Sequence, residues 1–480
     1  MKVNDFEVIN PIIDIILFLI LMRKRDPMTL MLVLFTYGTM HFSFATIALI
    51  SNDSAKLLVT MHQEGGGILA KLSAILCVVG VYILLGKYAF LRLKSNKLSL
   101  NAKKILFFTI FLMGALICGY FLNIRQGDSL QLKNVFSIEA LLTLLLFGFL
   151  SLEENKLLTH FGFNINKWFL GGVFILFLAD CLSFYEVFWR HAWAWTHESS
   201  GQNVYRASFT LFNPNLLAFW ASLIYIGCAY AMHTQMKYRK IMMLSMILAS
   251  VTIFFSGSRS VGLLLLGMLV ILPLLLRKRF YWFPLMIFFS VILTIYTTSA
   301  LLFKIFMRGN DGWSSIFFLG QRLITTPLDL YNYAIWMIAN KLHHLPFELS
   351  FEVKGLPSEL KESINGRLSG AVPDSGWLVL YRDVGWIGTI PMLIACLMIF
   401  FWAARIYAAN RSIESVYALI IFLFCILIGF VMRIQIFAVW LFISIFLVPC
   451  LVLWSKTLDK KVRVKNKEFL SREKAFERSS

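Results

Sequence analysis

The chain has 480 residues, of which 59% are hydrophobic and only 15% are charged. A soluble globular domain is about half apolar and about a quarter charged, so this composition excludes an ordinary soluble fold and favours a membrane protein. The formal net charge is +19. Much of the Lys and Arg lies in short segments between apolar runs, and no nucleic-acid-binding motif interrupts them. We therefore expect the lipid bilayer as a partner, and no nucleic acid.

The cysteines do not form a metal or disulfide framework in the sequence. Their number is odd, all fall inside apolar runs, and none is paired at metal-ligand spacing. They are predicted to be small hydrophobic side chains within helices. We expect no metal ion and no cofactor.

Thirteen apolar runs are long enough, or nearly long enough, to cross a bilayer. Each is expected to be helical because hydrocarbon offers backbone N–H and C=O groups no other partner. The first run is short and could join the second as a hairpin, so the predicted fold is an all-α polytopic membrane protein of about 12 to 14 transmembrane helices. The runs are 11–22, 28–50, 67–91, 105–123, 134–152, 168–188, 215–233, 241–257, 260–276, 280–303, 386–404, 415–432 and 435–454.

The basic connections predict the orientation of these helices. Clusters of Lys and Arg occupy 23–25, 92–104, 237–240, 277–279 and the tail 456–480. Alternating crossings place all of them on one side, which the positive-inside rule identifies as the cytoplasm. The remaining connections then lie on the outer side.

The pattern predicts five regions along the chain. A long hydrophilic stretch separates the tenth and eleventh apolar runs, and loops of this length commonly carry function. No internal repeat is visible, which weakens an inverted-repeat transporter fold. The regions are N-terminal helices (1–155), central helices (156–304), a large outer loop (305–375), C-terminal helices (376–455) and a basic cytoplasmic tail (456–480).

The first polar cluster on the predicted outer side covers 205–215. Asn213 and Asn215 flank Pro214, and proline is favoured in the first turn of a helix. Asn213 therefore has a structural alternative as an N-cap. Arg206 lacks such an explanation, because a basic residue on the outer face is not favoured by topology.

The second cluster is the tight turn at 256–260 between two apolar runs. Gly257 permits the turn, and Ser258 is a candidate cap of the next helix. Arg259 stands at a helix N-terminus, which already favours anions, so the sequence predicts an anion site here. The alternative is an arginine that reaches the phospholipid headgroups.

The third cluster, at 373–388, closes the long loop and opens the run at 386–404. Asp374 could be an N-cap. Its place at the membrane end of the loop also suits a general base or a partner of an acceptor hydroxyl.

Arginines gather on the predicted outer side. Guanidinium groups bind phosphate oxygens in pairs, so such a set suits a diphosphate. A diphosphate on the outer face of a membrane indicates a polyprenyl-linked sugar. The arginines are Arg206, Arg259, Arg322, Arg367, Arg382 and Arg433.

In these three clusters the chain resembles the O-antigen polymerase and O-antigen ligase superfamily of bacterial inner membranes. The resemblance covers roughly residues 160–450. The matching segments are Arg206 with Asn213-Pro214-Asn215, the turn Ser256-Gly257-Ser258-Arg259 with Leu263, and Asp374-Ser375-Gly376-Trp377-Leu378 with Gly385-Trp386-Ile387-Gly388. Their order, and the long loop between the second and third segments, also match.

The resemblance implies a metal-independent membrane glycosyltransferase of the GT-C type in the bacterial inner membrane, with its large loop periplasmic. The donor would be a glycan on undecaprenyl diphosphate, and a chain-length regulator and a flippase are further candidate partners. Family ligases carry a His-Asn pair where this chain has Asp374-Ser375, whereas polymerases often have Asp. This difference favours a polymerase over a ligase that transfers glycan to lipid A-core, and leaves the catalytic base open.

Roles for individual residues follow from the resemblance. Arg206 and Arg259 would hold the diphosphate, and Asp374 would position or deprotonate the acceptor. Further candidates for substrate binding are Asn213, Asn215, Ser258, Arg322 and Arg382.

A polysaccharide or lipid-linked sugar transporter is the alternative from another class. A transporter needs ionisable residues within its spans. Lys71, Glu139 and Asp180 fit this requirement loosely.

Overall fold

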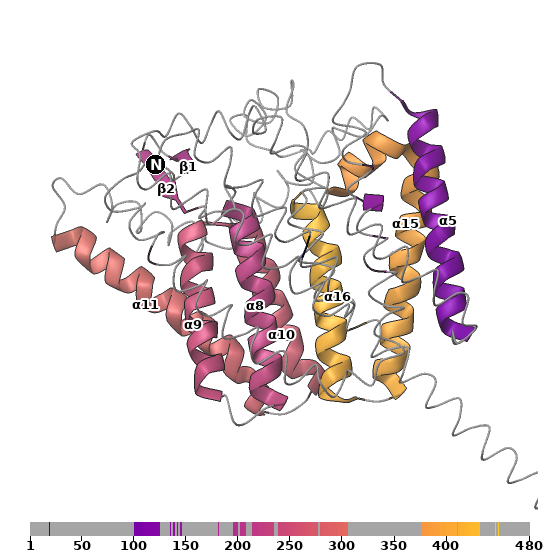
Figure 1. Ribbon diagram of the computed structural model, residues 1–480. Helices are drawn as coiled ribbons and strands as arrows, with labels where there is room; N and C mark the ends of the chain where they lie inside the picture. Colours follow the sequence, from indigo (N-terminus) through magenta and orange to yellow (C-terminus); the bar gives the residue numbers. More distant parts are fainter. Residues whose placement is uncertain are drawn as a thin grey trace, which may run out of the picture.

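A computed structural model describes about two fifths of the chain. The described parts are 100–124, 195–199, 202–207, 214–234, 239–276, 279–305, 376–409 and 411–432, with isolated positions at Leu19, Val135, Ile138, Glu139, Leu142, Leu145, Cys181, Leu447 and Cys450. Nearly all of these residues are helical (Figure 1).

Seven helices in this part of the chain contain apolar stretches of 18–26 residues, long enough to cross a membrane. They are α5 (Leu100–Leu122), α8 (Pro214–Thr234), α9 (Arg239–Ser256), α10 (Arg259–Leu276), α11 (Phe283–Ile305), α15 (Gly376–Ala409) and α16 (Ile413–Val431). Their lengths and apolar composition indicate a multi-pass membrane protein.

Seven of the predicted apolar runs correspond to these helices, and the other six lie wholly or largely outside the described residues. The run predicted at 386–404 begins too late. Helix α15 starts at Gly376 and is interrupted at Gly385, which has φ 59° and ψ −161°. The prediction located the part of α15 after this break and missed the helical segment before it.

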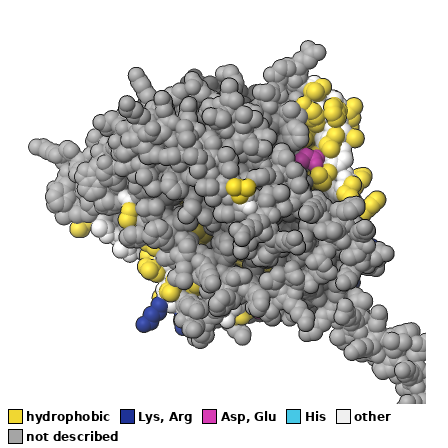
Figure 2. Space-filling view, viewed as in Figure 1, with side chains coloured by type: hydrophobic (Ala, Val, Ile, Leu, Met, Phe, Trp, Pro, Cys, Tyr) yellow, Lys and Arg dark blue, Asp and Glu magenta, His cyan; other side chains and the backbone are white. Residues whose placement is uncertain are grey.

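Helices α8, α9 and α10 run alternately up and down the bundle (Figure 1). The end of α9 and the start of α10 lie beside the start of α8, because Arg206, Ser256, Asn215 and Ser258 are hydrogen-bonded to one another there. We call this the upper end, as it is drawn in Figure 1. Helix α9 begins with Arg239 and Lys240 at the opposite, lower end, where Figure 2 shows described Lys and Arg side chains in dark blue.

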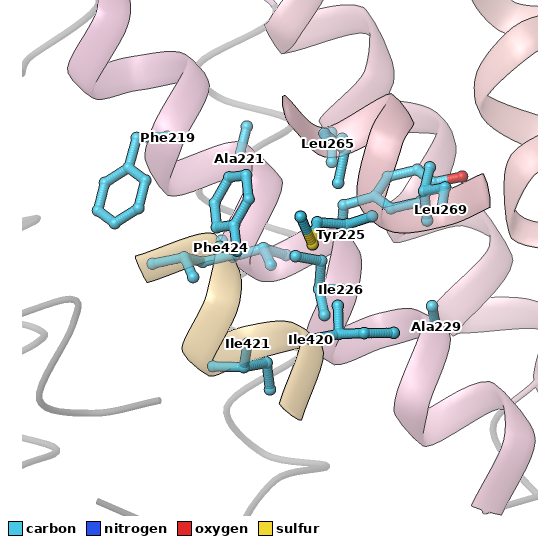
Figure 3. Close-up of a cluster of buried hydrophobic side chains, with 14 of the residues drawn as sticks. Phe219, Ala221, Tyr225, Ile226, Ala229, Leu265, Leu269, Ile420, Ile421 and Phe424 are labelled. Carbon is cyan, nitrogen blue, oxygen red and sulfur yellow. The ribbon is translucent and has the colours of Figure 1, made fainter. Parts of the chain in front are cut away.

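Helix α8 is the centre of the packed core. Almost all of its side chains are buried, and Figure 3 shows several of them next to side chains of α10 and α16. Phe219 of α8 stacks on Phe424 of α16 with ring centroids 5.8 Å apart. Tyr225 packs edge-on against Phe288 of α11 at 5.8 Å and donates its hydroxyl hydrogen to the Pro284 carbonyl.

Hydrogen bonds from side chains also join helices at the lower end. The Nδ1 atom of His233 in α8 is hydrogen-bonded to the hydroxyl of Tyr417 in α16 at 2.6 Å. Tyr407 of α15 donates to the carbonyl of Leu275 in α10 at 3.0 Å. These bonds join α8 to α16 and α15 to α10 at the lower end.

A two-stranded antiparallel ribbon lies at the upper end (Figure 1). Strand β1 is Trp195–Ser199 and strand β2 is Gln202–Arg206, paired from Trp195 with Arg206 to Ser199 with Gln202. The sequence pattern predicts only an outer loop for this segment, and the structure pairs two of its stretches as strands. The ribbon brings Arg206 to the point where the chain next enters the membrane helices.

Helix α5 packs closely on α15 around the break. A Cβ at Gly119 would lie 2.3 Å from the Val384 carbonyl oxygen, and one at Gly385 would lie 2.5 Å from the amide nitrogen of Asn123. Small residues allow helix backbones in membranes to approach in this way. The other side of α5 is exposed and apolar, as the yellow side chains on this flank in Figure 2 show.

Candidate functional site

Three helix ends meet at the upper end of the bundle. Helix α8 begins at Pro214, α9 ends at Ser256, and α10 begins at Arg259. Only Gly257 and Ser258 connect α9 to α10. Gly257 has φ 58° and donates its N–H to the Phe254 carbonyl at 3.0 Å. This left-handed conformation suits glycine and makes so short a turn possible.

The side chain of Asn215 joins the first and second polar clusters. Its Oδ1 atom accepts a hydrogen bond from Nη2 of Arg206 at 3.1 Å and another from the hydroxyl of Ser258 at 2.8 Å. Ser258 is 2% exposed. Arg206, Asn215, Ser258 and Arg259 therefore lie close together, although the first and the last are 53 positions apart in the sequence.

Arg206 also has a structural role that the sequence did not reveal. Its Nε donates to the carbonyl of Ser256 at 2.9 Å, and the next residue, Ala207, donates its N–H to the Phe255 carbonyl at 2.9 Å. The last carbonyls of a helix lack partners within the helix and carry partial negative charge, so a cation there is stabilising. Arg206 thus holds the ribbon to the end of α9, and this contact fixes the direction of its guanidinium group.

Arg259 contributes the second guanidinium group. It is the first residue of α10, directly after Ser258, and it is half-buried, with its Nε atom inaccessible to solvent. The first turns of α8 and α10 contain no acidic residue. Their N-termini add partial positive charge to that of Arg206 and Arg259, which suits an anion with several oxygens.

The helical part of the third cluster lies at the same end of the bundle. Gly376, the first residue of α15, donates its N–H to the Met432 carbonyl at 3.1 Å, just beyond the end of α16. The indole Nε1 of Trp377 donates to the Ile426 carbonyl at 3.2 Å. Because α16 also packs on α8, these bonds hold the start of α15 at the upper end.

The other predicted site residues are placed only in part. Asn213, Arg322 and Asp374 lie outside the described residues. For Arg382 the structure describes the backbone, within α15, and not the side chain.

Asp383 is a buried acidic residue that is not among the predicted site residues. Its side chain is 2% exposed, two positions before the break at Gly385. An ionisable residue within a membrane helix is expensive to bury and commonly functional. The available signal was that Asp383 is the one acidic residue in the 34 residues of α15.

The described site combines guanidinium groups, a hydroxyl and helix N-termini, a set of donors suited to oxyanions. Within the described ranges, no three His, Cys, Asp or Glu side chains gather as they would around a metal ion. Comparison with known proteins found no match to the chain among protein-family models, curated proteins or solved structures.

Proposed function

We propose that the protein is a membrane glycosyltransferase that polymerises undecaprenyl-diphosphate-linked oligosaccharide repeat units of an O-antigen, capsule or exopolysaccharide at the periplasmic face of the bacterial inner membrane. The observation that carries this proposal is the meeting of Arg206, Asn215, Ser258 and Arg259 where three helices of membrane-spanning length end. A lipid diphosphate carries its charges at this depth, next to the ends of membrane helices.

The proposed reaction needs one bond formed and one broken. The acceptor hydroxyl oxygen attacks the anomeric carbon of the donor glycan, and the bond from that carbon to the diphosphate oxygen breaks. The electron pair leaves with the lipid diphosphate, and the hydroxyl proton passes to a base, for which Asp374 is the candidate. Arg206 and Arg259 stabilise the charge that develops on the leaving diphosphate. Arg322 and Arg382 remain candidates for further phosphate or sugar contacts.

Substitution of Arg259 tests the anion-binding role most cleanly, because Arg206 also caps α9. We expect Arg259→Ala to abolish glycan extension in cells while the protein still inserts at normal levels. Arg259→Lys should retain partial activity, because it keeps the charge and loses the paired N–H geometry. Arg206→Ala should abolish extension and also lower thermal stability. Full-length polymer in cells carrying either alanine variant would show that the arginines do not hold the donor.

The surface polysaccharide of a strain lacking the gene separates polymerase from ligase. A polymerase defect leaves lipopolysaccharide or capsule with a single repeat unit. Complete absence of attached glycan indicates transfer to lipid A-core, and a normal profile indicates neither reaction.

A transporter of lipid-linked sugars is the second candidate, because two carboxylates are buried in apolar segments. Glu139 is 8% exposed and Asp383 is 2% exposed. Such residues are common along ion and substrate pathways. In vesicles containing the purified protein, the polymerase would release lipid diphosphate and lengthen the glycan on one face, whereas a transporter would move the intact lipid-linked glycan across the bilayer without releasing diphosphate.

A further inference from the structure

Helix α10 carries a row of accessible apolar positions that begins one turn after Arg259. Leu263, Gly267, Val270 and Leu274 follow Arg259 at successive spacings of 4, 4, 3 and 4 residues, so they lie on one face of the helix. Leu263 is half-buried, and Val270 and Leu274 are 37% and 60% exposed. A Cβ at Gly267 would meet nothing within 4 Å. We call these four residues the α10 row.

The other apolar side chains of α10 are buried in the core or partly buried against it. Leu265 and Leu269 point toward α8 in Figure 3, and both are buried. Val261, Met268 and Leu272 are also buried. The α10 row is therefore the side of this helix that remains open to an apolar ligand or to lipid.

The α10 row is continuous with the cationic site. The 15 positions from Arg259 to Leu274 correspond to about 22 Å along the helix, most of the thickness of a hydrocarbon core. A ligand with an anionic head at Arg206 and Arg259 and a long apolar chain would match both parts at once. Neither part alone selects such a molecule, because ordinary lipid tails also cover exposed apolar faces.

We propose that the α10 row is the binding path of the polyprenyl chain of a lipid diphosphate whose head is held by Arg206 and Arg259. This inference rests on the proposed function, and it assigns the tail of the donor to one face of one helix. Open space at Gly267 leaves room for the branched chain near the middle of the helix.

A comparable apolar row on α15 is the main competitor. Trp386, Ile390 and Leu397 are 48%, 44% and 55% exposed. The break at Gly385 separates this row from the helical segment at its upper end, so the row does not continue in register past the break. The α10 row runs on from Arg259 within one helix, and for this reason we assign the chain to α10.

The test uses a polyprenyl diphosphate that carries a diazirine in its tail, bound to the full-length protein in nanodiscs of phosphatidylethanolamine and phosphatidylglycerol. After illumination, labelled peptides are mapped by mass spectrometry with and without excess unlabelled undecaprenyl diphosphate. Label on α10 between Arg259 and Leu274 should be displaced by the competitor. Label on the exposed face of α5 should not be displaced, because bulk lipid and free probe reach it.

Two glycines provide a matched pair of variants. Gly267 in α10 and Gly114 in α5 both have open space around an added Cβ. Gly267→Trp should lower displaceable labelling about fivefold or more, the low end of the cost of overfilling an occupied apolar site. Gly114→Trp should leave it unchanged.

The outcomes separate the two proposals. Two results would overturn the tail path: displaceable label on α15, or equal effects of the two tryptophan substitutions. If binding of the lipid diphosphate still depended on Arg259 in that case, the glycosyltransferase proposal would stand. No binding of the lipid diphosphate at all, measured with radiolabelled undecaprenyl diphosphate, would overturn both.

Discussion

Replacing Asn215 by Asp changes the charge of the site without changing its shape. The Oδ1 atom of Asn215 accepts from both Arg206 and Ser258, and an aspartate presents an oxygen in the same place. The new negative charge then lies next to the guanidinium group that is proposed to hold the diphosphate. The two hydrogen bonds that Oδ1 accepts are kept, and the bound anion is repelled by the new negative charge.

The size of this effect can be estimated from Coulomb's law. A guanidinium group that bridges two oxygens separates them by roughly 6 Å. With an effective dielectric constant of about 20, two unit charges at this distance repel by about 3 kcal/mol, which is about a 100-fold loss of affinity. We therefore expect Asn215→Asp to weaken binding of undecaprenyl diphosphate about 100-fold while the melting temperature stays the same or rises.

Asn215→Ala is the matched control for the fold. It leaves the donors of Arg206 and Ser258 without this acceptor, and the cost of losing one neutral and one charge-assisted hydrogen bond is about 2–4 kcal/mol of unfolding free energy. Binding of radiolabelled lipid diphosphate and thermal unfolding, measured on the same preparations, separate the two effects. Wild-type affinity in Asn215→Asp, with unchanged stability, would refute an anion site beside Arg206.

Three further substitutions and one control test the packing of the helices, at the upper and the lower end, by thermal unfolding of the purified protein. Gly385→Ala should cost about 1–3 kcal/mol of unfolding free energy, since the residue has positive φ and little space. The control Gly114→Ala should be neutral or stabilising, because Gly114 lies inside a helix with open space. Equal losses of stability in the two variants would contradict the break in α15. Trp377→Phe removes one hydrogen bond to α16 and should cost about 1 kcal/mol, and an unchanged melting temperature would contradict that anchor. Tyr417→Phe should cost a similar amount by removing the bond to His233 at the lower end, and glycan extension should continue; its loss would contradict a purely structural role.

Local sequence features determined the membrane helices. A run of apolar residues long enough to cross a bilayer forms a helix wherever it occurs, because hydrocarbon leaves the backbone no other hydrogen-bond partner. The run predicted at 215–233 is observed as Pro214–Thr234, and the turn predicted from Gly257 lies between α9 and α10. Local features also marked the segments 205–215 and 256–260 as polar clusters at helix ends, whereas their grouping into one site was expected from the family resemblance.

Only the tertiary structure decided how those residues are connected. Arg206 donates a hydrogen bond to the carbonyl of Ser256, 50 positions later in the sequence. A local sequence pattern does not predict which distant carbonyl an arginine will bind. The break at Gly385 could not be predicted from the sequence either, because glycine permits a left-handed conformation without requiring it. In the structure, helix α5 packs closely against α15 at this break. Helix formation depends on neighbours along the chain, whereas caps, breaks and shared acceptors depend on which helices pack together.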